Sequence, residues 1–380
     1  MIPLSLYIHI PWCVRKCPYC DFNSHEIKKE LPEAEYISAL VRDLEQELPA
    51  VWGRKIQSIF IGGGTPSTLS PESYDALFSQ LRARLIIMPD TEITMEVNPG
   101  TVDQYKLSEY QKTGVNRLSI GAQSFNNDLL QRIGRIHDRR AAFNAVESAH
   151  HAGFENINLD IMFGLPTQTI EQGQSDIKNA IALEPTHISF YELTIEPNTL
   201  FYKQPPTLPT ENKMIQIQET GKTLLSENGF QQYEISAYAK SQRQCKHNLN
   251  YWQFGDYIGI GAGAHGKITS PENMNITRRA KLRSPQDYMD KAGLDASVSS
   301  TRELSDNDRI LEFMMNALRL NDGFPVTLFE ERTGLDIALI EDTINKAMDN
   351  DLIEQTSERL RPTEKGRNYL NDLTQLFMAN

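Results

Sequence analysis

Three cysteines stand close together near the start of the 380-residue sequence. Cys13, Cys17 and Cys20 form a C-x3-C-x2-C array, whereas the remaining cysteine, Cys245, lies far away in the chain. Three thiolates at this spacing can converge on one metal centre. Zinc sites usually have four ligands and iron–sulfur clusters usually take four cysteines, so a set of three leaves one iron open to an exchangeable ligand. Because clustered cysteines in a reducing compartment usually indicate metal binding, we reject the alternative of unrelated buried thiols.

The elements that position these cysteines follow a repeating pattern up to about residue 200. Short apolar, β-branched segments alternate with helix-like stretches, which predicts six consecutive βα units and a parallel sheet. Ser70 before Pro71 predicts a helix start, and Gly114 and Gly153 predict helix ends. The predicted strands cover Leu4–Ile10, Ser58–Ile61, Glu92–Val97, Arg117–Ile120, Asn156–Ile161 and His187–Leu193.

Polar or glycine-rich residues follow each of these strands. The cysteine array follows the first strand and residues 62–66 follow the second, while the ends of the later strands carry Glu96, Gln123, Asp160 and Glu192. A barrel builds its active site from loops at the carboxyl ends of its strands, whereas a doubly wound sheet concentrates such residues at one switch point. The pattern therefore favours a partial barrel of the α/β class.

The βα pattern stops after about residue 200, and we divide the chain into residues 1–200, 201–300 and 301–380. In the middle segment, amphipathic periodicity predicts a helix over Glu211–Glu227, and the aromatic-rich stretch Phe230–Tyr257 predicts strands and turns. The last segment has short helical patterns and a polar hairpin around Ser357–Pro362, an order that suggests a winged-helix-like domain. Because this segment is acidic, we expect it to pack on the chain or to bind protein rather than DNA.

Composition and charge exclude several classes of protein. Fifty Asp and Glu against 38 Lys and Arg give a formal net charge of −12, which argues against a nucleic-acid binder that tracks phosphates. No run of about 18 apolar residues occurs, so we expect no membrane span. The first residues lack the basic segment and cleavage site of a signal peptide. With only four cysteines, most of them bunched, the sequence indicates a cytosolic protein.

The cysteine array, with Tyr19 before its last cysteine, resembles the signature of the radical S-adenosylmethionine (SAM) superfamily. The resemblance implies a [4Fe-4S] cluster held by Cys13, Cys17 and Cys20, with SAM bound to the fourth iron. It also implies a partial (β/α)6 barrel and cleavage of SAM to a 5′-deoxyadenosyl radical. The similarity also extends to residues 7–13 and 62–66 and to single positions of the barrel. These residues resemble one branch of the superfamily, the coproporphyrinogen III oxidase-like proteins.

The same resemblance assigns a set of residues to SAM binding. Gly63 and Gly64 would let the backbone approach the ligand and would offer N–H groups to its carboxylate. Glu96 and Asp160 would accept hydrogen bonds from the ribose or the ammonium group, and Arg135 would pair with the carboxylate. Each of these residues alone also fits an ordinary turn, cap or packing role. The complete set is Tyr7, Tyr19, Gly63, Gly64, Thr65, Glu96, Gln123, Arg135 and Asp160.

Two functions compete within this branch, a radical decarboxylase and a haem carrier. The oxidases carry a fourth cysteine two residues after the third and a longer N-terminal segment, whereas this chain has Phe22 there and twelve residues before Cys13. The stretch His247–Trp252 matches the H-N-x-x-Y-W motif of the haem chaperone family HemW. We therefore favour haem binding and transfer to acceptor proteins, with no catalytic residue assigned. A coproporphyrinogen III oxidase and a non-catalytic, cluster-bearing regulator remain the alternatives.

His247 is the haem ligand that this motif implies. A neutral imidazole is the usual axial ligand of haem iron, and Tyr251 and Trp252 supply flat apolar area for a porphyrin. Without the motif, His247 would more simply be a buried, hydrogen-bonded histidine. Cys245 is a second candidate ligand, although a free cysteine usually behaves as a small apolar residue. The family also suggests an acceptor in a membrane-bound respiratory enzyme.

Overall fold

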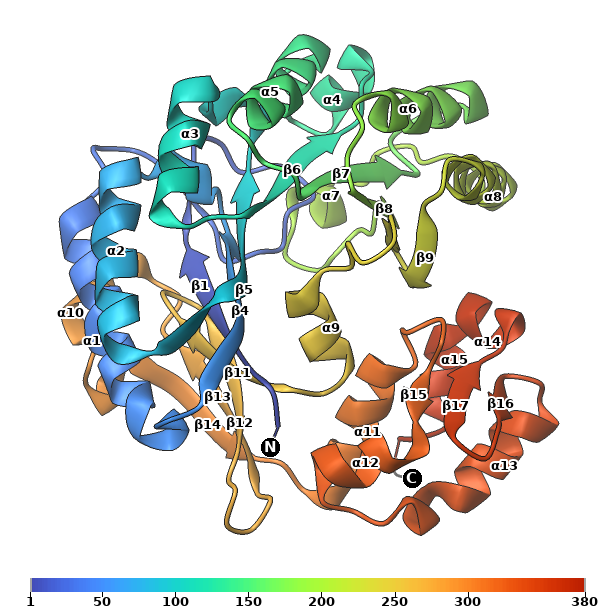
Figure 1. Cartoon of the computed structure of the whole chain (residues 1–380). Helices are drawn as coiled ribbons and strands as arrows, with labels where there is room; N and C mark the ends of the chain where they lie inside the picture. The colour runs from blue at the N-terminus through green and yellow to red at the C-terminus, as the bar shows by residue number, and fades with distance from the viewer. Residues whose placement is uncertain (1, 379–380) are drawn as a thin grey trace.

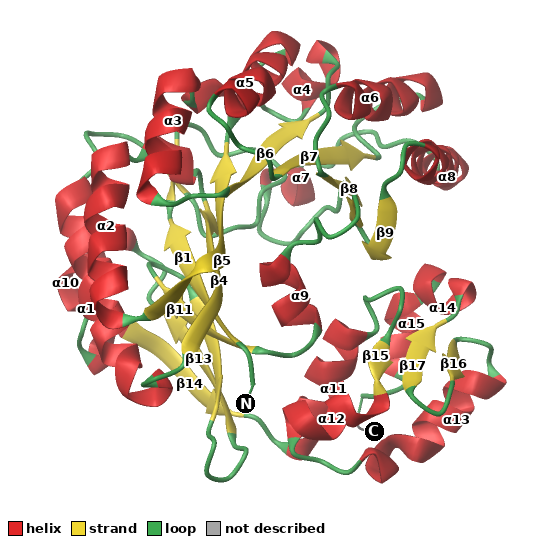
Figure 2. Cartoon of the chain, viewed as in Figure 1, coloured by secondary structure: helices red, strands yellow, loops and turns green. Residues whose placement is uncertain are grey.

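The computed structural model describes residues 2–378, and its centre is one curved sheet of twelve strands (Figures 1 and 2). In chain order these are β1 (Leu4–Ile10), β4 (Lys55–Gly63), β5 (Ile86–Val97), β6 (Arg117–Gln123), β7 (Ile157–Phe163), β8 (His187–Glu192), β9 (Gln231–Glu234), β10 (Ala237–Ala239), β11 (Asp256–Ile260), β12 (His265–Thr269), β13 (Ile276–Lys281) and β14 (Val298–Glu303). Two short strands, β2 (Trp12–Cys13) and β3 (His25–Glu26), pair beside the cysteine loop.

The six predicted strands lie side by side and parallel, in the order β1-β4-β5-β6-β7-β8. Strand β11 adds a further parallel strand next to β1, and antiparallel strands extend both edges. The sheet begins at β14 and ends at β9, so it curves without closing. The expected partial barrel is thus confirmed, with an extension that the repeat did not predict.

Helices cover the convex face of this sheet (Figure 2). The Ser70 side chain accepts a bond from the backbone of Ser73, and Gly114 adopts a left-handed conformation with φ of 114° where its helix ends, as expected. The helices of the barrel region are α1 (Glu33–Val51), α2 (Pro71–Arg84), α3 (Gln104–Thr113), α4 (Asn127–Arg132), α5 (Arg139–His151), α6 (Ile170–Ala182), α7 (Leu200–Lys203), α8 (Glu211–Glu227), α9 (Lys246–Trp252) and α10 (Pro285–Lys291), with 3₁₀ turns η1 (Pro66–Thr68), η2 (Pro99–Thr101) and η3 (Asp295–Ser297).

Successive residues of a strand point alternately to the helix-covered face and to the concave face of the sheet. On β1, Leu4, Leu6 and Ile8 are buried in the main hydrophobic core with residues of the covering helices. Burying each such side chain stabilises the fold by about 1.5–3 kcal/mol. The residues between them, Ser5 and Tyr7, point to the concave side, where they meet polar and aromatic groups of β4. The interior of the barrel is therefore polar enough to hold a site, while the outer layer provides the stability.

The C-terminal segment forms a smaller unit beside the open side of the barrel (Figure 1), around a second hydrophobic core that also includes Phe254 and Ile276 of the preceding segment. It has a three-stranded sheet in the order β15-β17-β16, and the predicted polar hairpin is the connection between β16 and β17. This arrangement fits the expected winged-helix-like domain. Its elements are α11 (Asp306–Ala317), β15 (Phe324–Pro325), α12 (Val326–Thr333), η4 (Ile337–Ile340), α13 (Glu341–Asp349), β16 (Ile353–Gln355), β17 (Arg359–Pro362), α14 (Glu364–Asn368) and α15 (Leu370–Gln375).

Two details of the sequence-based prediction are wrong. The aromatic-rich stretch Phe230–Tyr257 contains helix α9 in addition to strands, because tertiary packing overrides the strand preference of aromatic residues. Asp160 does not end its strand, since β7 continues to Phe163. Asp160 therefore lies at mid-depth in the barrel rather than at the rim. Across residues 2–378, no helix combines the length and the apolarity that crossing a bilayer requires.

Candidate functional site

The three clustered cysteines lie at the carboxyl end of the barrel, on the loop after β1. Their thiols are free, with Cys13 buried and the other two partly exposed. Burial raises the pKa of Cys13 and of Cys20, so a positively charged partner would be needed to hold both as thiolates at neutral pH. Each thiol has a polar neighbour: Thr65 Oγ1 lies 3.4 Å from Cys13 Sγ, Arg135 Nη1 lies 3.7 Å from Cys17 Sγ, and Ser24 Oγ lies 3.9 Å from Cys20 Sγ.

These contacts allow the cysteine loop to be tested as a cofactor site. The structure brings together free thiols from one loop, a guanidinium beside one of them and a hydroxyl beside each of the others. Among the described residues, no three His, Cys, Asp or Glu side chains are arranged around a single metal ion, the cysteines included. The donor set of three soft sulfur ligands fits an iron–sulfur cluster.

The glycine-rich segment after β4 is built for close backbone contact. Gly63 has a φ of 111°, and a Cβ atom there would come within 2.5 Å of the His9 ring; a Cβ on Gly64 would come within 2.5 Å of the carbonyl oxygen of Trp12. The N–H group of Gly63 donates to Glu96 Oε2 at 3.1 Å, and those of Gly64 and Thr65 donate to backbone carbonyls. These N–H groups are therefore occupied by groups of the chain itself in this conformation, and the expectation that they hold the carboxylate of SAM stays a prediction.

Glu96, Gln123 and Arg135 gather at the same end of the barrel. Burial, with the nearby carboxylate of Asp160, raises the pKa of Glu96 to about 8. Gln123 has a φ of 66°, an uncommon backbone conformation for a residue other than glycine, and its Oε1 accepts a 2.7 Å bond from the Tyr191 hydroxyl. Arg135 donates to the Gly121 carbonyl at 2.7 Å, while its buried Nε has no partner within the described chain. The structure thus brings these predicted residues together.

The other residues assigned to SAM lie at different depths of the barrel. Tyr19 is on the cysteine loop, 6.5 Å from the ring of Phe201. The Tyr7 hydroxyl lies 3.1 Å from His9 Nδ1, below the rim. Asp160 accepts bonds from Ser119 and Asn158 at mid-depth, and its burial raises its pKa. Tyr19 therefore stays with the cysteines, whereas Tyr7 and Asp160 lie towards the middle of the interior.

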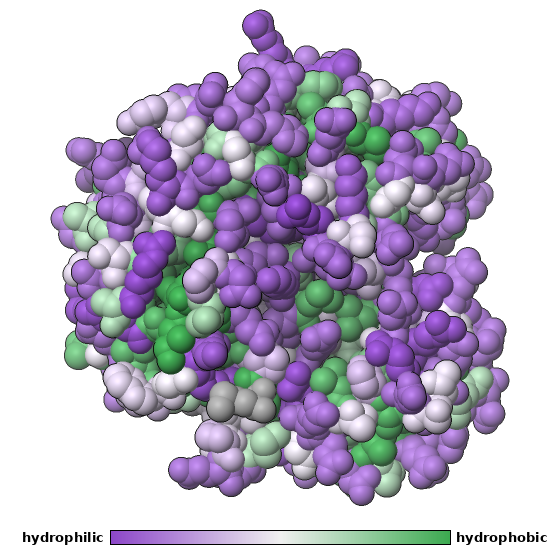
Figure 3. Space-filling view, viewed as in Figure 1, coloured by the Kyte–Doolittle hydropathy of each residue, from purple (hydrophilic) through white to green (hydrophobic). Residues whose placement is uncertain are grey.

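His247 lies at the opposite, amino end of the same interior, on helix α9. It is 1% exposed, and its ring packs against Phe60 with centroids 5.1 Å apart. Its Nδ1 is 3.0 Å from Ser58 Oγ and its Nε2 is 3.0 Å from the Tyr251 hydroxyl, so both ring nitrogens are hydrogen-bonded. Burial, together with the charge of Arg117, lowers the pKa of His247 to about 3, which keeps the imidazole neutral. Figure 3 shows apolar side chains gathered in the middle of the visible face, over the position of α9 in Figure 1.

Several polar residues around His247 were not predicted as part of a site. Glu92 accepts bonds from the His247 backbone N–H at 3.3 Å and from the Cys245 thiol at 3.6 Å. Arg117 is 2% exposed and faces the same interior. The sequence does offer one signal, because Arg117 is a charged residue in an otherwise apolar strand. Burying a charge without a partner costs free energy, so such a residue is a candidate for a functional role.

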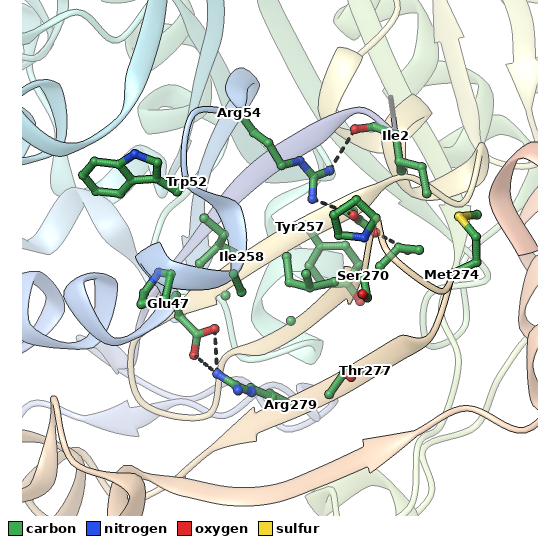
Figure 4. A pocket seen from close by; sticks show the side chains of 18 of the residues that line it. Ile2, Glu47, Trp52, Arg54, Tyr257, Ile258, Ser270, Met274, Thr277 and Arg279 are labelled. Carbon is green, nitrogen blue, oxygen red and sulfur yellow. Dashed lines mark hydrogen bonds and ion pairs between the residues drawn. The ribbon is translucent and has the colours of Figure 1, made fainter.

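A cavity of about 960 Å³ lies elsewhere, at the end of α1 and along β11 to β13 (Figure 4). None of the predicted site residues lines it. Figure 4 shows Arg54 directed at the carbonyl of Ile2 and Glu47 facing Arg279, and Arg54 also pairs with Asp256 at 2.9 Å. Since these charges pair with one another, the cavity does not present a free ionic group from this set.

Comparisons of the sequence and of the structure with known proteins point to the same family. Residues 7–178 match the model of the radical SAM superfamily, and residues 304–369 match that of the HemN C-terminal domain. Three relatives named heme chaperone HemW, from Escherichia coli, Haemophilus influenzae and Bacillus subtilis, are 48%, 47% and 35% identical; each comparison covers 99% of this chain and at least 98% of the relative. The structure of coproporphyrinogen III oxidase (HemN) from Escherichia coli shares the fold, with a TM-score of 0.83 at 23% identity over 99% of this chain and 90% of that one.

Proposed function

Because this chain belongs to the HemW family of haem chaperones, within the radical SAM superfamily, we propose that it binds haem and transfers it to acceptor proteins. The observation that carries the proposal is the 48% identity to the HemW relative from Escherichia coli over 99% of this chain. A similarity that extends from the barrel through the C-terminal domain includes the stretch around His247 as well as the cysteine loop.

Membership in the radical SAM superfamily implies a [4Fe-4S] cluster and SAM. In this proposal Cys13, Cys17 and Cys20 hold the cluster, which supplies one-electron chemistry to SAM when both are bound. Arg135 lies beside Cys17, with Nη1 3.7 Å from its Sγ, so a positive charge stands next to this proposed ligand. Glu96 would accept a hydrogen bond from the ammonium group of SAM through the oxygen that its bond to Gly63 leaves free. The chain's own contribution is thus charge and orientation at the rim of the barrel.

His247 would be the side chain that ligates the haem iron. Its low pKa keeps a neutral nitrogen available as a ligand at physiological pH. The bond between Nε2 and the Tyr251 hydroxyl occupies one nitrogen and the bond to Ser58 occupies the other, so ligation requires one of these bonds to break. Since Tyr251 lies four residues later on the same helix, a shift of α9 as a whole would leave that bond in place, whereas rotation of the Tyr251 side chain would release Nε2.

The oxidase alternative lacks a specific supporting contact. At the position two residues after Cys20, Phe22 is 57% exposed, and an aromatic ring neither ligates metal nor exchanges thiols. The likeness to HemN, at 23% identity, concerns the fold alone. We propose that the acceptors are haem proteins reached from the cytoplasm, with membrane-bound respiratory enzymes as the class that the family suggests.

One paired experiment separates these functions. Protein reconstituted with iron and sulfide under anaerobic conditions is loaded with haem and mixed with haem-depleted membranes that contain a b-type respiratory enzyme. We expect the b-type spectrum to reappear in the membranes. The same preparation, given coproporphyrinogen III, SAM and a reductant, should form no protoporphyrinogen. Formation of protoporphyrinogen, or haem that stays with the soluble protein, would overturn the proposal.

A further inference from the structure

Three fully buried cationic side chains occur in the described chain, and one of them differs from the others. Lys267 pairs with Asp256 at 3.1 Å, and Lys281 pairs with Asp43 at 2.5 Å and with Glu47 at 2.7 Å. Such pairing is the rule, because an isolated charge loses its hydration on burial. Arg117 is 2% exposed, yet none of the described carboxylates lies within 4 Å of its guanidinium, and its buried Nε has no hydrogen-bond partner among residues 2–378.

Arg117 faces the interior of the barrel rather than the core between sheet and helices. It shares its face of β6 with Ser119, whose hydroxyl bonds Asp160 inside the barrel. Its register partner on β5 is Thr94, which is fully buried and whose hydroxyl also lacks a partner among the described residues. Two neighbouring strands therefore present an unpaired guanidinium and an unpaired hydroxyl to the same space.

The acidic groups nearest to this pair are engaged elsewhere. Glu92, two residues before Thr94 on the same face of β5, accepts bonds from the His247 N–H and the Cys245 thiol. Asp160 accepts bonds from Ser119 and Asn158. Glu92 links this part of the interior directly to His247, because its Oε1 lies 3.3 Å from the His247 backbone nitrogen. The unpaired guanidinium is thus next to the residue proposed to ligate haem.

We propose that Arg117 is a carboxylate-binding residue inside the barrel and that it pairs with a propionate of the haem ligated by His247. The inference rests on the proposed haem binding. A guanidinium matches a carboxylate through two parallel N–H···O bonds, and a site shielded from water strengthens that pair. Thr94 would donate a further hydrogen bond to the same carboxylate. Haem carries an iron at the centre of a flat apolar ring and two propionates at one edge. The imidazole of His247 would bind the iron, and the nearby guanidinium would bind a propionate.

The test compares haem with haem dimethyl ester, which has the same ring and iron but no carboxylates. Both are titrated in the same mild detergent into the wild-type protein and into Arg117→Met. We expect the wild type to bind haem at least tenfold more tightly than the ester, and Arg117→Met to bind the two equally. The ester should still give the spectrum of a histidine-ligated haem, because His247 is unchanged.

Each other outcome has a distinct meaning. If the wild type binds neither haem nor its ester, the proposed function fails and this inference fails with it. If it binds both equally, only the carboxylate site is refuted. SAM carries a carboxylate too, so SAM binding is measured in the same variants. Unchanged SAM affinity in Arg117→Met is expected, whereas a loss confined to SAM would assign Arg117 to that ligand and overturn the haem assignment.

The haem-free protein gives a second readout. Arg117→Met breaks no close ion pair and should lower the melting temperature less than the matched variant Lys267→Met, which breaks the buried pair with Asp256. A similar loss in both variants would show that Arg117 has a structural partner and would contradict the proposal. If Arg117→Met does not fold, Arg117→Lys keeps the charge without the planar fork and should retain only part of the preference for haem over its ester.

Discussion

The two ends of the barrel interior hold their functional groups in opposite states. At the carboxyl end, three thiols are free and the Nε of Arg135 has no partner among the described residues. At the amino end, both ring nitrogens of His247 are hydrogen-bonded and the residue is 1% exposed. The comparison teaches that the proposed ligands of the first site are free before a cofactor binds, whereas those of the second are bonded to neighbouring side chains and must exchange a hydrogen bond to bind haem.

Releasing His247 for ligation costs little free energy. A hydrogen bond within a protein contributes about 0.5–1.5 kcal/mol, so releasing Nε2 from Tyr251 costs about that much. The free imidazole then gains an iron ligand. A closed site of this kind protects the ligand until haem arrives, and it predicts that changes at the two ends act independently.

The largest effect should follow from removing one thiol at the carboxyl end. We expect Cys17→Ser, reconstituted under anaerobic conditions, to lose the visible absorbance of the cluster entirely, because two thiolates cannot hold it. Cys245→Ser is the matched control, since this thiol bonds Glu92 at the amino end. A full cluster in Cys17→Ser, or loss of the cluster in Cys245→Ser, would contradict the assignment of the cluster to the carboxyl end.

Glu96 should make the stability of the carboxyl end depend on pH. Its pKa is raised to about 8 from 4.5, so the folded protein binds a proton more tightly than the unfolded chain between those values. The stability that this group contributes is therefore fully present below pH 4.5 and is lost by about pH 8. The total loss is on the order of 4–5 kcal/mol, of which about 2–3 kcal/mol falls between pH 6 and pH 9. Urea denaturation of the apoprotein at pH 6 and pH 9 measures this. Glu96→Gln should remove most of the difference, and an unchanged slope would contradict the raised pKa.

Gly63 should be far less tolerant of a side chain than an exposed glycine with a similar backbone. Gly63→Ala combines a left-handed φ with a clash against His9, and we expect a loss of about 3 kcal/mol. Gly53, with a φ of 75°, has open space around it, so Gly53→Ala should cost only about 1 kcal/mol. Equal losses in urea denaturation would mean that the rim tolerates the displacement of His9.

The smallest effect should appear at the closed end. Tyr251→Phe removes the hydroxyl bonded to His247 Nε2 and leaves the ring in place. Ligation through Nε2 breaks that bond in the wild type, so the variant should bind haem about fivefold more tightly, which corresponds to about 1 kcal/mol. Weaker haem binding in Tyr251→Phe would show that the hydroxyl assists ligation rather than opposing it.

The sequence predicted the carboxyl end better than the amino end, for a physical reason. The cysteines are neighbours in the chain, and the polar groups of the rim follow strands whose apolar pattern is easy to recognise. The bonds of His247 join residues 189 positions apart, and α9 lies in a stretch with the composition of strands. Arg117 is the first residue of a predicted strand, and only the packed sheet shows that its side chain faces the interior. Contacts between residues that are distant in the chain produce no local sequence pattern, so they cannot be predicted from residue spacing.

The most direct test of the two-site account is a haem titration of cluster-loaded protein, followed by visible absorbance. We predict that His247→Ala loses at least tenfold in haem affinity while it keeps the iron and sulfide content and the cluster spectrum of the wild type. His151→Ala, on the solvent side of α5, is the control for loss of a histidine. Undiminished haem affinity in His247→Ala, or loss of the cluster together with haem, would contradict two separable sites in one barrel.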